Sequence, residues 1–173
     1  MANKHLARIT VVGLGYIGLP TASLLATRGY QVLGCDVSPS VVETINRGDI
    51  HIEETDLDVM VNSAVNSGHL SAALVPAAAE IFIIAVPTPF KNKFEPDLSY
   101  VEAATKSIAP FIKANDLIIL ESTSPVGATD RMAEWLAALR TDLTVPLSNK
   151  KVNEDETNRI FILIHFFIGK RNC

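Results

Sequence analysis

The stretch "VVGLGYIGLPTA", residues 11–22, decides the fold of this chain. It carries the pattern G-x-G-x-x-G at Gly13, Gly15 and Gly18, between a β-branched run and a run with helical spacing. A strand that enters such a pattern and a helix that leaves it are typical of a dinucleotide-binding turn. Gly13 would permit the tight turn, Gly15 would let a pyrophosphate approach the backbone, and Gly18 would let the helix pack close to the strand.

The residues around this turn indicate which dinucleotide it binds. We expect the N–H groups of Tyr16 and Ile17 to point at the phosphates, at the positive end of the helix dipole. The pattern also predicts an acidic residue about 20 positions on, after the second strand. Asp36 stands 18 residues past Gly18, directly after "QVLGC". Its carboxylate would accept hydrogen bonds from both ribose hydroxyls and repel a 2′-phosphate, so we predict NAD rather than NADP. The same pattern can also bind FAD, but no other feature of the sequence indicates a flavin.

Apolar strand runs and amphipathic helix runs alternate along most of the chain. We expect strands over residues 8–13, 30–36, 80–89 and 116–122. We expect helices over residues 16–29, 38–48, 55–68, 97–112 and 129–140. This alternation, with strands that read as continuous apolar runs, predicts an α/β fold: a Rossmann-type, doubly wound parallel sheet with helices on both faces.

Helix-start signals leave some choices open. The second helix could be capped by Ser38, or it could open with a capping box at Ser40. Thr55 and Asp58 stand at capping spacing for the third helix.

The last part of the chain reads differently. A polar, charged stretch after residue 146 precedes the apolar block "IFILIHFFIG", residues 160–169. The block could be one more strand of the sheet, or an aberrant end with an aggregation-prone segment. We therefore divide the chain into an NAD-binding domain, residues 1–146, and an unassigned divergent tail, residues 147–173.

Composition excludes several classes of partner. The formal net charge is -4 over 173 residues, and no basic cluster recommends nucleic acid. The apolar block is too short to cross a bilayer, which takes roughly 20 residues, so we expect no membrane association. The two cysteines and four histidines form no disulfide framework and no metal-ligand spacing. We expect Cys35 to be a buried, inert thiol, no metal, and a reducing cytoplasmic location.

Two strand ends carry polar side chains toward the expected site. Ligands of open α/β sheets bind beyond the carboxyl ends of the strands. In "AVPTPF", Thr88 offers a hydroxyl there, although the two prolines could simply stop the strand. In "ESTSPVG", we expect Thr123 to face the nicotinamide end of the cofactor, although these hydroxyls could instead cap the next helix. We expect Thr129 to cap that helix, with a cofactor contact as the alternative.

Several blocks together resemble one family. They are "GLGYIGLPTA", "INRGDIHIEETDLD", "AVPTPFKNKFEPDLSYVEAA", "SIAP" and "ESTSPVGATDRMAEWLA". Over residues 8–146 the chain is similar to the N-terminal part of the UDP-glucose/GDP-mannose dehydrogenase family. Glu121 stands where the UDP-glucose enzymes tend to carry lysine, and "GDIHIEETDL" with "PTPFK…EPDL" favours the branch that oxidises UDP-N-acetylmannosamine.

The resemblance implies a two-step oxidation. The C6 alcohol of the UDP-sugar becomes an aldehyde and then a carboxylate, two NAD are reduced, and the product is a precursor of surface polysaccharides. The family enzymes are homodimers. The threonine that helps to order water and substrate near the family's catalytic thiol corresponds to Thr123. The family's cofactor-loop positions correspond to Gly13, Tyr16, Ile17, Gly18, Asp36 and Thr88.

The departures from the family are informative too. The family thiol lies in a G-G-H-C motif that this chain lacks, and neither Cys35 nor Cys173 has its surroundings. We therefore expect a fold truncated relative to the family and a chain that is not catalytically complete alone. A fragment of a UDP-glucose or UDP-N-acetylglucosamine 6-dehydrogenase, and a non-catalytic NAD-binding module, remain alternatives. A 3-hydroxyacyl-CoA type of dehydrogenase is disfavoured by "ESTSPVG" and "VPTPFK".

Overall fold

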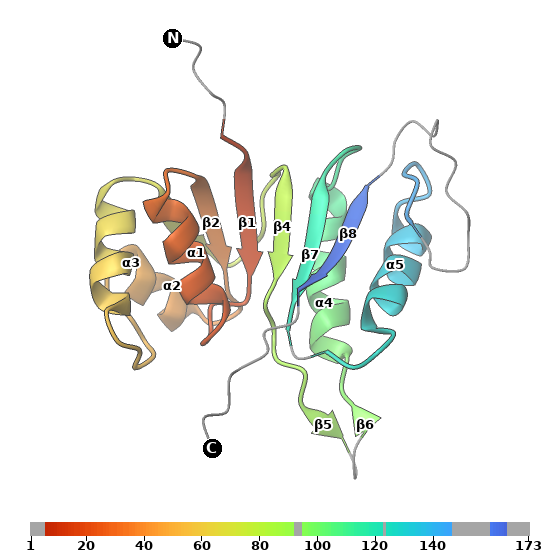
Figure 1. Ribbon diagram of the computed structural model, residues 1–173, viewed down its shortest axis with the longest axis horizontal. Helices are drawn as coiled ribbons and strands as arrows, with labels where there is room; N and C mark the ends of the chain where they lie inside the picture. Colours follow the sequence, from red (N-terminus) through yellow and green to blue (C-terminus); the bar gives the residue numbers. More distant parts are fainter. Residues whose placement is uncertain (1–5, 92–94, 123, 147–159, 166–173) are drawn as a thin grey trace.

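A six-stranded, all-parallel sheet in the order β3-β2-β1-β4-β7-β8 forms the centre of the molecule (Figure 1). The computed structural model describes residues 6–91, 95–122, 124–146 and 160–165. The strands are β1 (Arg8–Val12), β2 (Gln31–Cys35), β3 (Leu70–Ala73), β4 (Ile81–Ile84), β7 (Leu117–Glu121) and β8 (Phe161–His165). The strand order reverses direction between β1 and β4, which confirms the doubly wound fold.

Five α-helices and one short 3₁₀ helix are seen in the described part of the chain. They are α1 (Gly18–Thr27), α2 (Pro39–Asn46), α3 (Leu57–Asn66), α4 (Ser99–Ile108), η1 (Ala109–Phe111) and α5 (Ala128–Leu139). A small antiparallel ribbon of β5 (Phe90–Lys91) and β6 (Glu95–Pro96) extends beyond the carboxyl end of β4 (Figure 1). Within the described residues, no helix is both long and apolar enough to cross a membrane.

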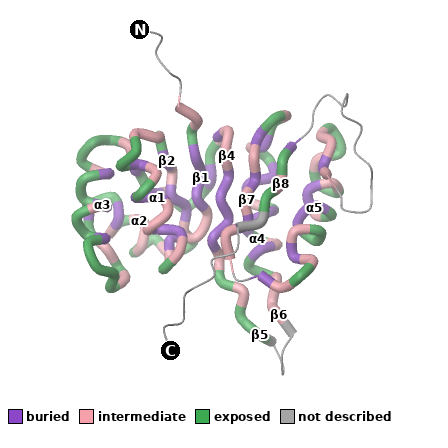
Figure 2. The backbone as a smooth tube through the Cα atoms, viewed as in Figure 1, coloured by how far each residue is buried: buried purple, intermediate pink, exposed green. Residues whose placement is uncertain are grey.

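The side chains of β4 show how the two faces of the sheet are covered. Ile83 belongs to a buried cluster with residues of α1, α2 and α3. Phe82 and Ile84, on the other face, belong to a second cluster with residues of α4 and α5. Figure 2 shows the buried backbone running through the central strands. Both faces of the central strands are therefore dry, which explains their uninterrupted apolar sequence.

The structure shows where the helices with uncertain start positions begin. Ser38 is the N-cap of α2 and Pro39 follows in the first turn, so the register that opens at Ser40 is not used. The expected cap of α3 by Thr55 is wrong. The N-cap is Asp56, whose φ of 62° places it in the left-handed region. That conformation is tolerated by aspartate better than by most residues, so the turn overrides the capping pattern.

One strand of the sheet escapes the sequence pattern. β3 has the sequence Leu-Ser-Ala-Ala, and it pairs in parallel with β2 at the edge of the sheet. Only Leu70 and Ala72 face the core. Four residues, of which three have small side chains, give too weak an apolar signal to predict a strand.

The apolar block near the end of the chain forms a strand in its described part. β8 pairs in parallel with β7, from Leu117 opposite Phe161 to Glu121 opposite His165. Ile160, directly before β8, is 1% exposed and belongs to the α4/α5 cluster. Of the two interpretations, the additional strand is the one observed. The boundary at residue 146 stays a prediction, since residues 147–159 lie outside the described residues.

Candidate functional site

The glycine turn lies at the reversal point of the strand order, between β1 and α1. Gly13 has a φ of 91°, and a Cβ built on it would stand 2.7 Å from the carbonyl oxygen of Ala85. A Cβ on Gly18 would stand 1.8 Å from the carbonyl oxygen of Gly13. Gly15 has nothing within 4 Å of such a Cβ. Gly13 and Gly18 are therefore required by the fold of the turn, whereas Gly15 faces open space.

The first turn of α1 presents backbone donors at this opening. Tyr16, Ile17 and Gly18 have N–H groups for which the described residues supply no acceptor. Intrahelical bonds start with Leu19, whose N–H donates to the carbonyl of Gly15 at 3.1 Å. Together with the helix dipole, such donors favour an anionic group at the turn.

Asp36 lies on one side of the turn, directly after β2. Its Oδ2 accepts a hydrogen bond from the backbone N–H of Leu14 at 3.0 Å, and its Oδ1 accepts one from Ser38 at 2.9 Å. Both bonds fix the carboxylate against backbone groups. A carboxylate has about four lone-pair sites, so it keeps capacity for two more donors, as a ribose diol would require.

Beside Asp36 a groove of about 370 Å³ opens on the face of the sheet opposite α1. Gly13, Asp36, Val37, Pro87 and Tyr100 contribute to its wall, which is mostly apolar. Val37 is 94% and Tyr100 51% exposed. Exposed apolar side chains around one groove are typical of a site for a flat aromatic ring. The sequence did not single out Val37 or Tyr100. The signal that could have found Val37 is its place directly after the acidic residue.

Cys35 also lines the groove. The side chain is buried, and burial raises the pKa of the thiol to about 12, with a contribution from the neighbouring charge of Asp36. At neutral pH it is a protonated thiol with little nucleophilic character. The expected burial of Cys35 is confirmed, and the raised pKa agrees with an inert thiol.

The threonines predicted at the strand ends fare differently. Thr88 is half-buried, beyond the carboxyl end of β4. Thr123 lies outside the described residues. The expectation that Thr129 caps α5 is wrong, because the N-cap is Gly127, with a φ of 89°, and the helix has begun at Ala128. A left-handed residue at the helix start replaces the side-chain cap.

β7 ends in a carboxylate. Glu121 is half-buried, and its Oε1 accepts a hydrogen bond from the hydroxyl of Thr21 on α1 at 3.3 Å. The bond joins the phosphate-facing helix to the strand that precedes the "STSP" segment.

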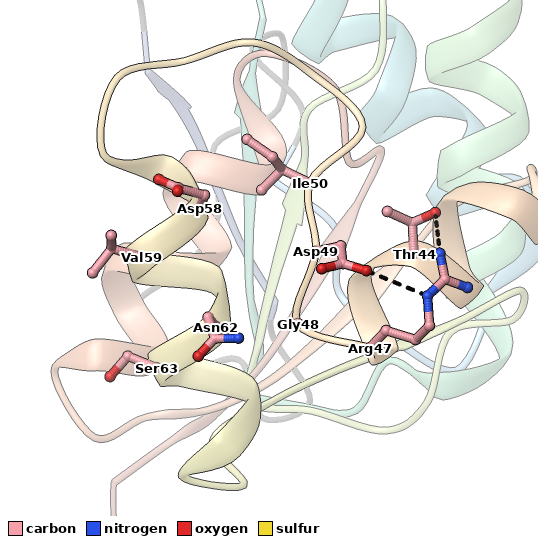
Figure 3. Close-up of a pocket in the computed structure, with 9 residues that line it drawn as sticks. All are labelled: Thr44, Arg47, Gly48, Asp49, Ile50, Asp58, Val59, Asn62 and Ser63. Carbon is pink, nitrogen blue, oxygen red and sulfur yellow. Dashed lines mark hydrogen bonds and ion pairs between the residues drawn. The ribbon is translucent and has the colours of Figure 1, made fainter.

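A second hollow, of about 780 Å³, lies between the end of α2 and α3 (Figure 3). Arg47 contacts Asp49 at 3.3 Å and the hydroxyl of Thr44 at 3.3 Å. The side chains that line this hollow carry charges of both signs, and the glycine turn is not part of its wall. In the described part of the chain, no group of three His, Cys, Asp or Glu side chains could hold a metal ion. The strand ends beside the turn are therefore the better candidate.

Comparison with known proteins shows which family has this sequence and site. The sequence model of the NAD binding domain of the UDP-glucose/GDP-mannose dehydrogenase family matches residues 7–156. The chain belongs to this family. Its cofactor is accordingly NAD, and the turn, Asp36 and the apolar groove are suited to a dinucleotide with an adenosine end.

Individual relatives of the chain are longer than it is. UDP-N-acetyl-D-mannosamine dehydrogenase of Yersinia pestis is 61% identical over 138 residues, which are 80% of this chain and 33% of the relative. NDP-N-acetyl-D-galactosaminuronic acid dehydrogenase of Ralstonia nicotianae is 56% identical, over 80% of this chain and 33% of the relative. The solved UDP-D-ManNAc dehydrogenase of Pyrococcus horikoshii superposes with a TM-score of 0.78 at 34% identity, over 93% of this chain and 37% of that one. The chain spans about a third of the length of the curated relatives it matches.

Proposed function

We propose that this chain is the cofactor domain of an NAD-dependent nucleotide-sugar 6-dehydrogenase. The observation that carries the proposal is the carboxylate of Asp36 held against the glycine turn, beside an apolar groove at the point where the strand order reverses. That combination of a phosphate cradle, a ribose acceptor and an aromatic-sized groove matches the parts of NAD in order.

Each part of the site has a distinct task in cofactor binding. The free space over Gly15 and the N–H groups of Tyr16 and Ile17 receive the pyrophosphate. Asp36 accepts from the adenosine ribose, and the groove beside Val37 holds the adenine. Bound NAD supplies the hydride acceptor for an alcohol oxidation.

The strand ends on the other side of the turn serve the nicotinamide half. Thr88 follows β4, Thr123 belongs to the segment that joins β7 to α5, and Thr129 is the second residue of α5. We assign them supporting roles there: hydroxyls that orient the carboxamide, the substrate alcohol or water.

The substrate we propose is a UDP-linked N-acetylhexosamine, oxidised at C6, with UDP-N-acetylmannosamine first among the candidates. The names of the two relatives at 56–61% identity support an N-acetylated sugar. UDP-glucose is the alternative substrate. The complete enzyme would work as a homodimer in the cytoplasm, with residues 1–146 as the main part of its NAD-binding domain and β8 as a further strand of the same sheet.

Titration of the chain with NAD and with NADP tests the proposal. Saturable binding of NAD that is at least about tenfold tighter than that of NADP is expected, because Asp36 would repel a 2′-phosphate. Asp36→Ala should weaken NAD binding by roughly 1–3 kcal/mol, the cost of a ribose diol left without its acceptor. Glu134→Gln, an exposed change on α5, serves as the control. Unchanged NAD affinity in Asp36→Ala would remove this residue from the site.

A further inference from the structure

A second carboxylate stands at the same level of the sheet edge as Asp36. Cys35, Val12, Ile84 and Leu120 form one row of paired residues across β2, β1, β4 and β7. Asp36 and Glu121 both lie one residue beyond this row. Three strand spacings separate them along the row, which is about 14 Å.

Both carboxylates also accept hydrogen bonds from α1 or from the turn that leads into it. Asp36 accepts from Leu14, in the turn that leads into α1. Leu120 packs toward α4 and α5, so the next residue, Glu121, faces the opposite side, where it accepts from Thr21 of α1. The start of the phosphate-facing helix is therefore flanked by one carboxylate on each side.

Each half of the sheet is expected to bind one half of the dinucleotide. A doubly wound sheet binds one mononucleotide on each side of the reversal point. Asp36, directly after β2, takes the adenosine half, and the apolar groove beside it reaches from the ends of β1, β2 and β3 to Pro87 after β4 and Tyr100 on α4. The nicotinamide nucleoside then belongs over β4 and β7, the half of the edge on which Glu121 stands.

We propose that Glu121 makes this site select the oxidised cofactor. The argument rests on the proposed function, since it needs NAD in this orientation. The nicotinamide ring is a cation in NAD⁺ and neutral in NADH, whereas the adenosine half is the same in both. A half-buried carboxylate beside the nicotinamide half attracts only the oxidised form. Glu121 thus favours binding of the oxidant and release of NADH.

Equilibrium binding separates this role from a purely structural one. Dissociation constants for NAD⁺, by calorimetry, and for NADH, by its fluorescence, are measured at one pH and salt concentration. Glu121→Gln should weaken NAD⁺ binding about fivefold, the ratio expected of one ion pair at a half-buried site, and leave NADH binding nearly unchanged. Asp36→Asn should weaken both forms alike, because the adenosine half does not change on reduction.

Two further variants test the charge itself. Thr21→Val removes the hydrogen bond but keeps the carboxylate, and Glu121→Asp keeps the charge on a shorter side chain. Both should retain the wild-type ratio of NAD⁺ to NADH affinity. Where Glu121→Gln folds poorly, Glu121→Ala takes its place and should show the same selective loss of NAD⁺ binding. An equal loss of both forms in Glu121→Gln, no loss of either, or the same altered ratio in Thr21→Val would overturn the inference. A wild-type chain that binds neither form would instead refute the proposed function.

Discussion

Gly15 and Gly18, two glycines of the turn, have different roles. A Cβ on Gly18 would collide with the carbonyl oxygen of Gly13, whereas a Cβ on Gly15 would meet open space. We therefore expect glycine at position 18 to be needed for folding, and glycine at position 15 to be needed for ligand binding. Stability and affinity should therefore separate cleanly between these positions.

Alanine substitutions at the two positions test this separation. Gly18→Ala should lower the free energy of unfolding by about 1–3 kcal/mol, because the helix must move away from the turn. Gly15→Ala should leave stability within about 0.5 kcal/mol, and it should weaken NAD binding about tenfold by filling the approach of the pyrophosphate. Urea unfolding and NAD titration of both variants give the comparison. Equal destabilisation by the two substitutions would contradict it.

A buried acid at the other end of the sheet predicts a pH effect. Asp116 is 6% exposed, and its Oδ2 accepts from the N–H of Lys113 at 2.6 Å. Burial raises the pKa of this carboxyl, and the negative charge of Glu80 raises it further. The folded chain thus holds this proton more tightly than the unfolded chain. The stability that Asp116 contributes is full below its unfolded pKa and is lost as the pH rises through the folded pKa.

Asp116→Asn mimics the protonated form and keeps an oxygen acceptor for Lys113. The variant should be more stable than the wild type at pH 7, and the difference should shrink as the pH falls toward 4. The measurement is the free energy of urea unfolding of both proteins across this range. A difference that does not vary with pH would show that the carboxyl does not titrate as inferred.

At the scale of elements, β8 shows that the divergent tail contributes to the core. Ile160 lies in the α4/α5 cluster with 1% exposure, whereas the next residue, Phe161, is 47% exposed. Neighbours in sequence thus differ in how far their side chains are covered.

Ile160→Ala should cost about 2–4 kcal/mol of unfolding free energy, as expected for a buried isoleucine. Phe161→Ala is the matched control, and it should cost less than about 1 kcal/mol, because about half of its surface is already in water. Thermal and urea unfolding of both variants provide the test. An Ile160→Ala chain as stable as the wild type would mean that the sheet does not need this strand.

The elements that the sequence predicted are those with strong apolar patterns. The runs "IFII" and "LIILE" are continuous and apolar, which is typical of buried strands, and they form β4 and β7. β3 was missed because Leu70 and Ala72 alone face the core. The helix caps went wrong where backbone conformation replaced side-chain bonds, at Asp56 and Gly127.

The candidate site was predictable only in part. Gly13, Gly18 and Asp36 followed from a spacing rule that reflects a backbone geometry, and the structure has that geometry. The groove beside Val37 depends on which segments the fold brings together, from β1 to α4, and no local pattern encodes that. Thr123 stays a prediction.

At the scale of the whole molecule, β4 contributes side chains to both core clusters, as its neighbours β1 and β7 do. Ile83 belongs to the α1/α3 side, and Phe82 with Ile84 belongs to the α4/α5 side. Loss of either cluster uncovers the same strand. The described sheet should therefore unfold as one unit.

Two probes can check this cooperativity. Trp135, the single tryptophan, packs against the α4/α5 cluster, so its fluorescence reports on that side. Far-UV circular dichroism reports on all helices. The two thermal transitions should coincide, and NAD at 100 times its dissociation constant should stabilise both by about 2.7 kcal/mol. Two separate transitions would show that the clusters melt independently.

The strand order also has a consequence for synthesis of the protein. β2 and then β3 add outward on one side of β1, while β4, β7 and β8 add outward on the other, so no strand is inserted between two already paired. On the ribosome, where chains fold from the N-terminus, the sheet can grow by its two edges alone. Yet Gly13 packs against Ala85. The nascent chain can complete its cofactor turn only after β4 has emerged, long after the turn itself has been translated.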